Sequence, residues 1–250
     1  MNLILIEPEE LTHDNIARVT GPRLRHLREV LGLVTGATLR VGVVDGPRGT
    51  AVVGSLNDDA AVLECTFDAV APGRPAVDLL LALPRPKVMR RLFAQLAALG
   101  VGRIMLTNAA RVERHYFDAH ILSPQIYRPL LIEGLQQARD TRLPVVTIHR
   151  QFRILVEDDL QDLGPSHGRI VAQPGDAPSI GQRAADSRPD RLMLAVGPEG
   201  GWNEFELSLL KTHAFLPISL GTRTLRSDTA CIALLTLAHD ALRQPATPIV

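Results

Sequence analysis

The chain is organised around two stretches, GPEGGWN at residues 197–203 and GTRTLRSDTA at residues 221–230. Each begins where an apolar strand ends, at Val196 and at Leu220, and a helical pattern follows each of them. Open parallel sheets bind ligands beyond the carboxyl ends of their strands, which is where such loops lie. Two loops of this kind, close in sequence, predict one ligand pocket at the edge of a parallel sheet.

From Val77 onward the chain alternates between strand and helix patterns. Apolar strands are predicted at residues 77–83, 103–107, 144–149, 169–172, 192–196 and 216–220. Helices are predicted at residues 86–99, 124–139, 152–160, 204–213 and 228–242, and residues 176–189 are predicted to be an exposed connection. This alternation predicts an α/β domain whose parallel sheet is covered by helices on both faces.

The first 70 residues follow a different pattern. A helix is predicted over residues 17–31, where Gly32 ends it, and short strands are predicted at residues 37–44, 50–56 and 61–67. Closely spaced short strands are typical of a small β-barrel or a curled sheet. A Pro- and Gly-containing segment follows at residues 71–75, so we predict two domains, at 1–71 and 76–250.

Composition excludes several classes of protein. The 27 basic residues balance the 27 acidic ones, so no net positive charge indicates a nucleic-acid partner. Only Lys87 and Lys211 are lysines. Arginine suits phosphate binding, but a GC-rich genome would give the same bias. Because Cys65 and Cys231 are isolated and no HExxH pair occurs, we expect neither a disulfide framework nor a metal site.

No targeting or membrane segment is evident in the sequence. The apolar run at the N-terminus ends at Glu7, and no apolar run approaches the roughly 18–20 residues that span a bilayer. We therefore expect a cytoplasmic protein without a membrane partner.

The first loop has features of a ligand loop and also of a tight turn. Gly197, Gly200 and Gly201 permit positive φ and a close approach of a ligand to the backbone. Asn203 suits a helix N-cap, with Glu206 three residues later as in a capping box. Neither a Walker sequence nor GxGxxG is present, which disfavours a phosphate-binding loop. Taken alone, this loop leaves both interpretations open.

The second loop adds two arginines to the predicted pocket. Arg223 and Arg226 flank Leu225, with Ser227 as the predicted N-cap and Asp228 in the first helical turn. An acidic residue there can simply complement the helix dipole. Two arginines beside a ligand loop suit either the binding of a phosphate or the stabilisation of negative charge on a reacting base.

Together the loops resemble the RsmE family of SPOUT-class methyltransferases. The shared pattern is GPEGG followed by LGxxxLRxxTA at residues 220–230, with weaker matches at residues 26–31, 44–46, 81–87, 99–101, 111 and 142–144. The resemblance implies S-adenosylmethionine-dependent methylation of N3 of a uridine in 16S ribosomal RNA of the small subunit, by a homodimer. It also implies an N-terminal PUA-like β-barrel that binds RNA, and a C-terminal trefoil knot in the α/β domain.

The resemblance further implies which residues bind the cofactor. These are residues of three neighbouring loops: Gln173, Val196, Gly197, Glu199, Gly200, Gly201, Leu220, Gly221, Leu225, Ser227 and Ala230. Leu220, Leu225 and Ala230 would offer backbone contacts and apolar walls to the adenine.

Catalysis and RNA binding are assigned to charged residues. Our hypothesis is that Arg226, assisted by Arg223, stabilises the uracil anion that forms when N3 loses its proton. Asp228 is either the proton acceptor or the group that orients the arginine. The predicted RNA contacts are basic residues of both domains: Arg23, Arg25, His26, Arg28, Lys87, Arg90, Arg91 and Arg111.

The chain departs from the family pattern at several positions. Ser227 and Asp228 stand where members usually carry Thr and Glu, and the usual Glu-Gln-x-x-Arg motif is altered at residues 136–140. Two alternative functions therefore remain open: a ribose 2′-O-methyltransferase of the same class, and a non-catalytic RNA-binding module on the same fold. A dinucleotide oxidoreductase would require a glycine fingerprint that this sequence lacks.

Overall fold

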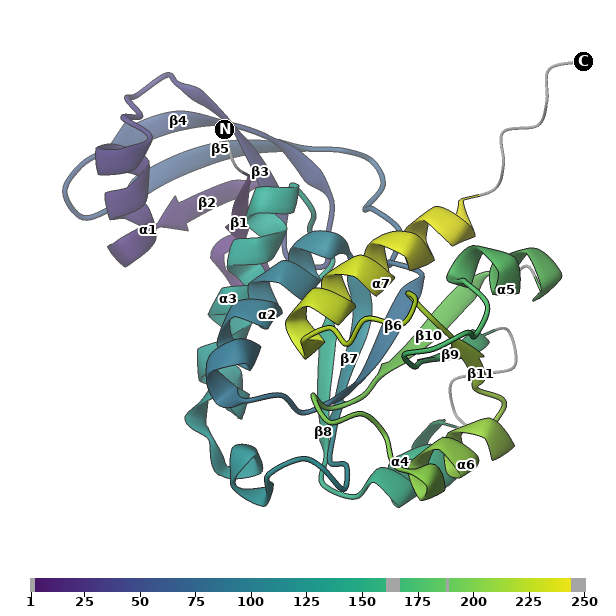
Figure 1. The fold of residues 1–250 in the computed structure, drawn as a ribbon. Coiled ribbons are helices and arrows are strands. Elements are labelled where there is room, and N and C mark those ends of the chain that lie inside the picture. The colour runs from purple at the N-terminus through teal and green to yellow at the C-terminus, as the bar shows by residue number, and fades with distance from the viewer. Residues whose placement is uncertain (1–2, 161–166, 188, 244–250) are drawn as a thin grey trace, which may run out of the picture. The chain divides into compact units, whose positions relative to one another are not determined.

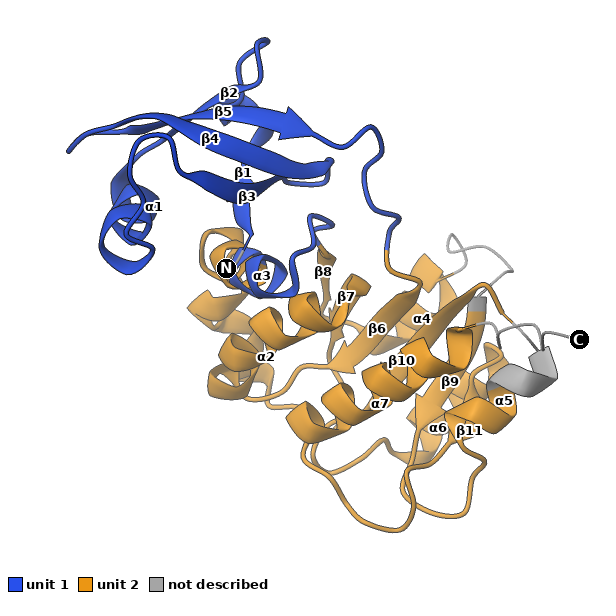
Figure 2. Cartoon of the chain, turned by 90° about the horizontal axis from the view of Figure 1, so that it is seen from above, with its two compact units in different colours: residues 1–74, 132–143 blue, residues 75–131, 144–250 orange. Residues whose placement is uncertain are grey.

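The computed structural model describes residues 3–160, 167–187 and 189–243 (Figure 1). The chain forms two compact units, one of residues 1–74 and 132–143, the other of residues 75–131 and 144–250 (Figure 2). The division after residue 74 falls within the Pro- and Gly-containing segment, but the sequence gives no signal that residues 132–143 belong to the first unit. Residues 244–250 of the predicted second domain lie outside the described residues.

The first unit contains a five-stranded mixed sheet. Its strands are β1 (Ile4–Ile6), β2 (Ile16–Val19), β3 (Thr38–Val43), β4 (Arg48–Leu56) and β5 (Ala61–Phe67), in the order β1-β3-β4-β5-β2. β1 and β3 are parallel, whereas the other neighbours are antiparallel. Alternate residues of the strands, such as Val41, Val53 and Leu63, are buried in one apolar core. This alternation is expected of a sheet with one solvated face.

The helix predicted over residues 17–31 is wrong in its first part. Residues 16–19 form β2, and the helix is reduced to α1 (Gly21–Arg25), which continues as a π-helical turn at His26–Val30. Gly21 has a φ of 61° and Pro22 occupies the first helical turn. A left-handed glycine followed by a proline sets the start of the helix. The residues before it, 16–19, can therefore form a strand that pairs with β5.

Residues 132–143 join the first unit through hydrogen bonds. The Leu3 amide donates to the Gln136 carbonyl at 3.1 Å, and the Asp45 amide donates to the Thr141 carbonyl at 2.8 Å. Thr141 is fully buried, and its hydroxyl donates to the Gly46 carbonyl at 2.6 Å. These bonds satisfy polar groups that burial would otherwise leave unpaired.

The second unit is built on a sheet of six parallel strands, as the sequence predicts. The strands are β6 (Val77–Ala82), β7 (Val101–Thr107), β8 (Val145–His149), β9 (His167–Ala172), β10 (Arg191–Val196) and β11 (Leu216–Ile218), in the order β11-β9-β10-β6-β7-β8. All six residues of β6 are buried. Such a strand requires cover on both faces of the sheet.

Helices cover this sheet. The helices of this unit are α2 (Pro86–Leu99), α4 (Phe152–Glu157), α5 (Ile180–Ser187), α6 (Glu204–Thr212) and α7 (Ser227–Leu242). A further helix, α3 (Pro124–Ala138), begins in this unit, and its residues 132–138 belong to the first unit. α2 and α7 lie side by side and pack on β6, β7 and β10, while α4 and α6 pack against each other (Figure 1). Among the described residues, no helix is long and apolar enough to cross a membrane.

α2 shows how local sequence sets an element of this unit. Pro86 stands in its first turn, where a missing amide hydrogen costs nothing. Its buried residues recur every three or four positions: Val88, Met89, Leu92, Phe93, Leu96 and Ala97. Gly100 ends the helix in the left-handed conformation, with a φ of 80°. The predicted bounds of this helix, 86–99, are confirmed.

The prediction that residues 176–189 form only a connection is wrong, because they contain α5. The Gln182 amide donates to the Ser179 hydroxyl at 3.3 Å, and the Ser179 amide donates to the Gln182 side chain at 2.8 Å. This reciprocal pair is a capping box. The spacing of Ser179 and Gln182 was therefore a local signal for a helix start, hidden within a stretch rich in Pro, Ser and Gly.

Candidate functional site

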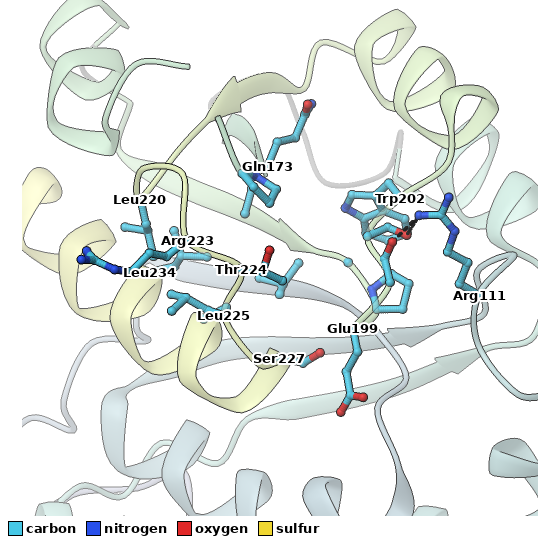
Figure 3. Close-up of a pocket in the computed structure, with 18 of the residues that line it drawn as sticks. Arg111, Gln173, Glu199, Trp202, Leu220, Arg223, Thr224, Leu225, Ser227 and Leu234 are labelled. Atoms are coloured by element: carbon cyan, nitrogen blue, oxygen red, sulfur yellow. Dashed lines mark hydrogen bonds between the residues drawn. The ribbon is translucent and has the colours of Figure 1, made fainter. Parts of the chain in front are cut away.

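A pocket of about 350 Å³ lies beyond the carboxyl ends of β9, β10 and β11 (Figure 3). β9 lies between the other two strands in the sheet, so the loops that follow all three strands meet there. The volume is in the range of small-molecule sites. The order of the strands, rather than the order of the loops in the sequence, thus brings the two glycine-bearing loops together.

The glycines of the first loop are explained by close contacts more than by positive φ. Of the three, only Gly201 has a positive φ, of 75°. A Cβ at Gly197 would lie 3.0 Å from Nε1 of Trp202, and a Cβ at Gly200 would lie 2.9 Å from Cδ of Arg111. Side chains at these two positions would therefore displace the residues that pack against the loop.

Arg111 and Glu206 hold the first loop from the side of β7. Nη1 of Arg111 donates to the Gly200 carbonyl and, at 3.4 Å, to the Gly201 carbonyl (Figure 3). The buried Glu206 accepts from the Ala110 amide at 2.6 Å and from the Asn203 amide at 2.8 Å. The predicted capping box of Asn203 and Glu206 is confirmed. It has the added function of joining α6 to the segment that carries Arg111.

The second loop is joined to the loop after β9. The Gln173 amide donates to the Ile218 carbonyl at 2.9 Å, and the Gly175 amide donates to the Gly221 carbonyl at 3.2 Å. The buried Ser219 hydroxyl donates to the Gly175 carbonyl at 2.6 Å and accepts from the Gly221 amide at 2.9 Å. Gly221, with a φ of 101°, allows the chain to turn at this point.

Two buried polar groups in the pocket wall lack a hydrogen-bond partner among the described residues. They are the hydroxyl of Ser227 and the indole Nε1–H of Trp202. Ser227 is the first residue of α7 rather than its N-cap, because Arg226, with extended backbone, precedes the helix. The predicted N-cap was therefore one residue too late. Since buried polar groups are almost always satisfied, these two groups indicate that the pocket receives a polar ligand.

Charged residues gather around this part of the unit. A carboxylate oxygen of Asp228 lies 3.3 Å from Nη2 of Arg91 and 3.5 Å from Nη2 of Arg226. Glu199 lies 3.8 Å from Nη2 of Arg85. Asp228 thus bridges two guanidinium groups, one on α2 and one immediately before α7.

The thiol of Cys231 is excluded as a nucleophile. Burial raises the pKa of Cys231 to about 12, and the charge of Asp228 acts in the same direction. A thiol with this pKa stays protonated at neutral pH.

The structure brings most of the predicted pocket residues together. All eleven residues assigned to the cofactor line the pocket, and so does Arg223. Arg226 and Asp228 do not line it, although both lie next to Ser227, which does. Three further wall residues, Pro174, Pro198 and Thr224, lie within the loops that were predicted to hold the cofactor. Sequence reasoning missed the following wall residues: Ala172, Trp202, Leu207 and Leu234. Trp202 could have been identified from the sequence as a wall residue, because it is the single tryptophan of the chain and follows GPEGG directly.

The predicted RNA contacts fall into different environments. Arg111 lines the pocket, and Lys87, Arg90 and Arg91 are exposed on α2. In the first unit, Arg25 and His26 are exposed as well.

Two further arginines of the first unit have protein partners. Arg23 donates to the Leu5 carbonyl and forms an ion pair with Glu10. Arg28 pairs with Asp58 at 2.7 Å. Part of the basic cluster of this unit therefore serves its own structure.

Comparison with known proteins identifies the family. A protein-family model described as an RNA methyltransferase domain matches residues 72–239 of this chain. Ribosomal RNA small subunit methyltransferase E of Treponema pallidum is 30% identical over 99% of this chain and 96% of its own length. The protein of that name from Synechocystis is 28% identical over 91% of this chain and 73% of its own length.

Solved structures show the same fold. The crystal structure of ribosomal RNA small subunit methyltransferase E from Neisseria gonorrhoeae bound to S-adenosyl methionine matches with a TM-score of 0.78. The two chains are 21% identical, and the match covers 96% of this chain and 97% of the other. A probable rRNA-methyltransferase from Porphyromonas gingivalis matches with a TM-score of 0.77 at 18% identity, over 97% of this chain and 98% of the other. The chain therefore belongs to the RsmE family of ribosomal RNA methyltransferases.

Proposed function

We propose that this chain transfers the methyl group of S-adenosylmethionine to N3 of a uridine in small-subunit ribosomal RNA. The observation that carries the proposal is the pocket beyond β9, β10 and β11, with its two unsatisfied polar groups and the arginines of the second loop beside it. Family membership supports methylation of ribosomal RNA. The choice of uridine N3 follows from the resemblance of the two loops to this family.

The residues of the pocket fit the proposed cofactor. Leu220, Leu225 and Leu234 provide an apolar wall suited to an adenine ring. The Ser227 hydroxyl and the Trp202 indole would gain hydrogen-bond partners from a polar ligand. Glu199, also in the wall, supplies a carboxylate for the positive charge of the cofactor. When bound, S-adenosylmethionine would supply an electrophilic methyl group on a sulfonium.

The arginines beside the pocket would control the charge of the nucleophile. The reaction forms an N3–methyl bond, breaks the sulfur–methyl bond and releases the N3 proton. Removal of that proton leaves negative charge on the uracil, which a nearby guanidinium stabilises. Arg226 would provide this charge and Arg223, in the pocket wall, would assist it. Because Asp228 lies between Arg91 and Arg226, we assign it the orientation of Arg226 rather than proton transfer.

The first test is the substitution Arg226→Ala. We expect turnover to fall at least 100-fold, as for other groups that stabilise transition-state charge. S-adenosylmethionine affinity should stay within about 3-fold, because Arg226 does not line the pocket. Methyl transfer to unmodified 16S RNA and to small subunits, with calorimetric titration of the cofactor, measures both quantities. Near-normal methylation by Arg226→Ala would overturn the catalytic assignment.

Nucleoside analysis of the product separates the alternatives. N3-methyluridine is the expected product, whereas a ribose-methylated nucleoside would identify a 2′-O-methyltransferase. A protein that binds RNA but shows no calorimetric response to S-adenosylmethionine would be a binding module only.

We propose three further properties that depend on the resemblance. The sheet of the first unit would act as a PUA-like RNA-binding domain, which deletion of residues 1–71 would test through RNA affinity. The chain would act as a homodimer, measurable by light scattering.

The segment between β11 and α7, held to the loop after β9, would form part of a trefoil knot. When the chain is pulled by its ends, its fully extended length should then be shorter than that of an unknotted chain with the same number of residues.

A further inference from the structure

A second cavity, of about 370 Å³, lies beyond the carboxyl ends of β7 and β8 in the same unit. Its wall comes from the segments after these strands and from the start of α6: Asn108, Ala109, Ala110, Val112, Arg114, Arg150, Gln151, Phe152, Arg153, Asn203, Phe205 and Glu206. It is next to the first pocket, since Arg111 of that pocket stands between Ala110 and Val112 of this wall, and Trp202 directly precedes Asn203.

An unsatisfied acceptor lies in the wall of this second cavity. Oδ1 of Asn108 is buried and has no hydrogen-bond partner among the described residues. The backbone of Asn108 is held in place, because its amide donates to the His149 carbonyl at 3.2 Å. A buried acceptor without a partner is uncommon in folded proteins and indicates a donor that arrives with a ligand.

The charge available to a ligand in this cavity is positive. Glu206 is the one acidic residue of the wall, and both its oxygens accept from backbone amides. It is only 3% exposed. Three arginines line the cavity: Arg150 pairs with Asp118, and Arg153 pairs with Glu157. Arg114 forms no ion pair with any residue that the structure describes, so it remains available for an anion.

An aromatic ring completes the wall. Phe205 is 59% exposed, the largest exposed fraction among the bulky apolar side chains of the second unit that the structure describes. Exposed aromatic rings next to cationic side chains bind unpaired bases by stacking, with little dependence on the base.

We infer that this cavity binds one unpaired nucleotide of the RNA substrate, beside the nucleotide that is methylated. Its base would stack on Phe205 and donate an N–H to Oδ1 of Asn108, and its phosphate would contact Arg114. The inference rests on the proposed function, because it requires that the uridine to be methylated reaches a cofactor held in the first pocket, next to this cavity. Aromatic stacking, base-edge hydrogen bonding and a phosphate contact together are typical of single-stranded RNA recognition.

The two main variants are at exposed residues, so that folding is preserved, and each has a matched control. Phe205→Ala is compared with Leu216→Ala, an exposed apolar residue outside both cavities, and Arg114→Gln with Arg103→Gln, an exposed arginine on β7. Affinity for unmodified 16S RNA is measured by filter binding at several salt concentrations, and cofactor affinity by calorimetry.

We expect Phe205→Ala to weaken RNA binding about 5- to 100-fold, the range for loss of one base stack. Arg114→Gln should lower the slope of log affinity against log salt by about 1 relative to the wild type. Cofactor affinity and the two control variants should match the wild type. Asn108→Ser should lower affinity for RNA but not change the salt slope.

Two results are distinguishable by design. If the wild type methylates RNA but Phe205→Ala and Arg114→Gln behave like their controls, the second cavity is not an RNA site and the proposed function stands. If the wild type neither binds the cofactor nor methylates RNA, the proposed function fails, and this inference fails with it.

Discussion

Arg111 illustrates how one residue can have a different function from the one that its charge suggests. Its guanidinium donates to the carbonyls of Gly200 and Gly201, and its side chain packs where a Cβ of residue 200 would lie. Charge-assisted hydrogen bonds of this kind are stronger than neutral ones. We therefore propose that Arg111 positions the first loop, in place of the RNA contact expected from its charge.

The substitution Arg111→Lys tests this role. Lysine keeps the charge but loses the planar group that bonds two carbonyls, so we expect cofactor affinity to fall about 10-fold, in line with the loss of one hydrogen bond to a charged group. Calorimetry with S-adenosylmethionine measures the change, and Arg103→Lys is the control. If cofactor affinity is unchanged while RNA affinity falls, Arg111 contacts RNA instead.

A second residue, His239 on α7, makes stability depend on pH. Burial lowers the pKa of His239 from its ordinary value of 6.5, and the nearby Arg243 acts in the same direction, against backbone hydrogen bonds to Gly100 and Leu99 that raise it. Between the lowered pKa and 6.5, the unfolded chain binds a proton that the folded chain does not. The stability conferred by the neutral ring is therefore complete above pH 6.5 and is lost as the pH falls.

The pH dependence can be assigned to this ring by substitution. We expect the melting temperature to decrease between pH 7.5 and pH 5.5, and to decrease less in His239→Gln. His120→Gln, at an exposed position, should follow the wild type. Equal decreases in all three proteins would show that another group is responsible.

At the scale of elements, α6 connects the two cavities. Its capping box satisfies the amides of Asn203 and Glu206, and the second oxygen of Glu206 reaches the Ala110 amide after β7. The start of one helix therefore fixes loops that follow two strands separated by β6 in the sheet order. The sequence identified the capping box, but the bond to Ala110 joins residues nearly a hundred positions apart.

The substitution Glu206→Ala should destabilise the second unit by about 2 kcal/mol, because it removes a cap and leaves the Ala110 amide unpaired. Glu204→Ala, at an exposed position in the same helical turn, should cost less. Thermal unfolding measures both, and a shift of several degrees separates them. Equal effects would mean that only the favourable charge at the helix start matters.

At the scale of the whole molecule, a formal net charge of zero means that RNA affinity must depend on local groups of basic residues. Lys87 and Lys211 provide a matched pair, because they are the only lysines and both are exposed. Lys87 lies on α2 beside Arg90 and Arg91, whereas Lys211 lies near the end of α6.

We expect Lys87→Gln to lower the salt slope of RNA binding by about 0.9, the value for one phosphate contact. Lys211→Gln should leave the slope unchanged. Affinities measured over a series of salt concentrations decide between them. Identical slopes for the two variants would remove Lys87 from the RNA surface.

Local patterns in the sequence allowed much of the fold to be predicted. The apolar runs of the second unit predicted its strands. Pro86 and Gly100 predicted the bounds of α2, because the backbone preferences of proline and glycine act locally. The same local reasoning failed at residues 17–31. There a helical pattern competes with strand pairing to β5, which no local preference reveals. It also missed α5, whose capping box lies in a stretch with the composition of a loop.

Motifs and periodicity along the chain were enough to identify the family, the parallel sheet and the eleven residues assigned to the cofactor, all of which line the pocket. The three-dimensional structure was needed to show the strand order that places the predicted loops together, the hold of Arg111 on the first loop, and the position of Asp228 between Arg91 and Arg226. It also revealed the second cavity beside the first pocket. The reason is physical: these contacts join residues far apart in the sequence, and their geometry depends on the order of strands in the sheet rather than on any local preference.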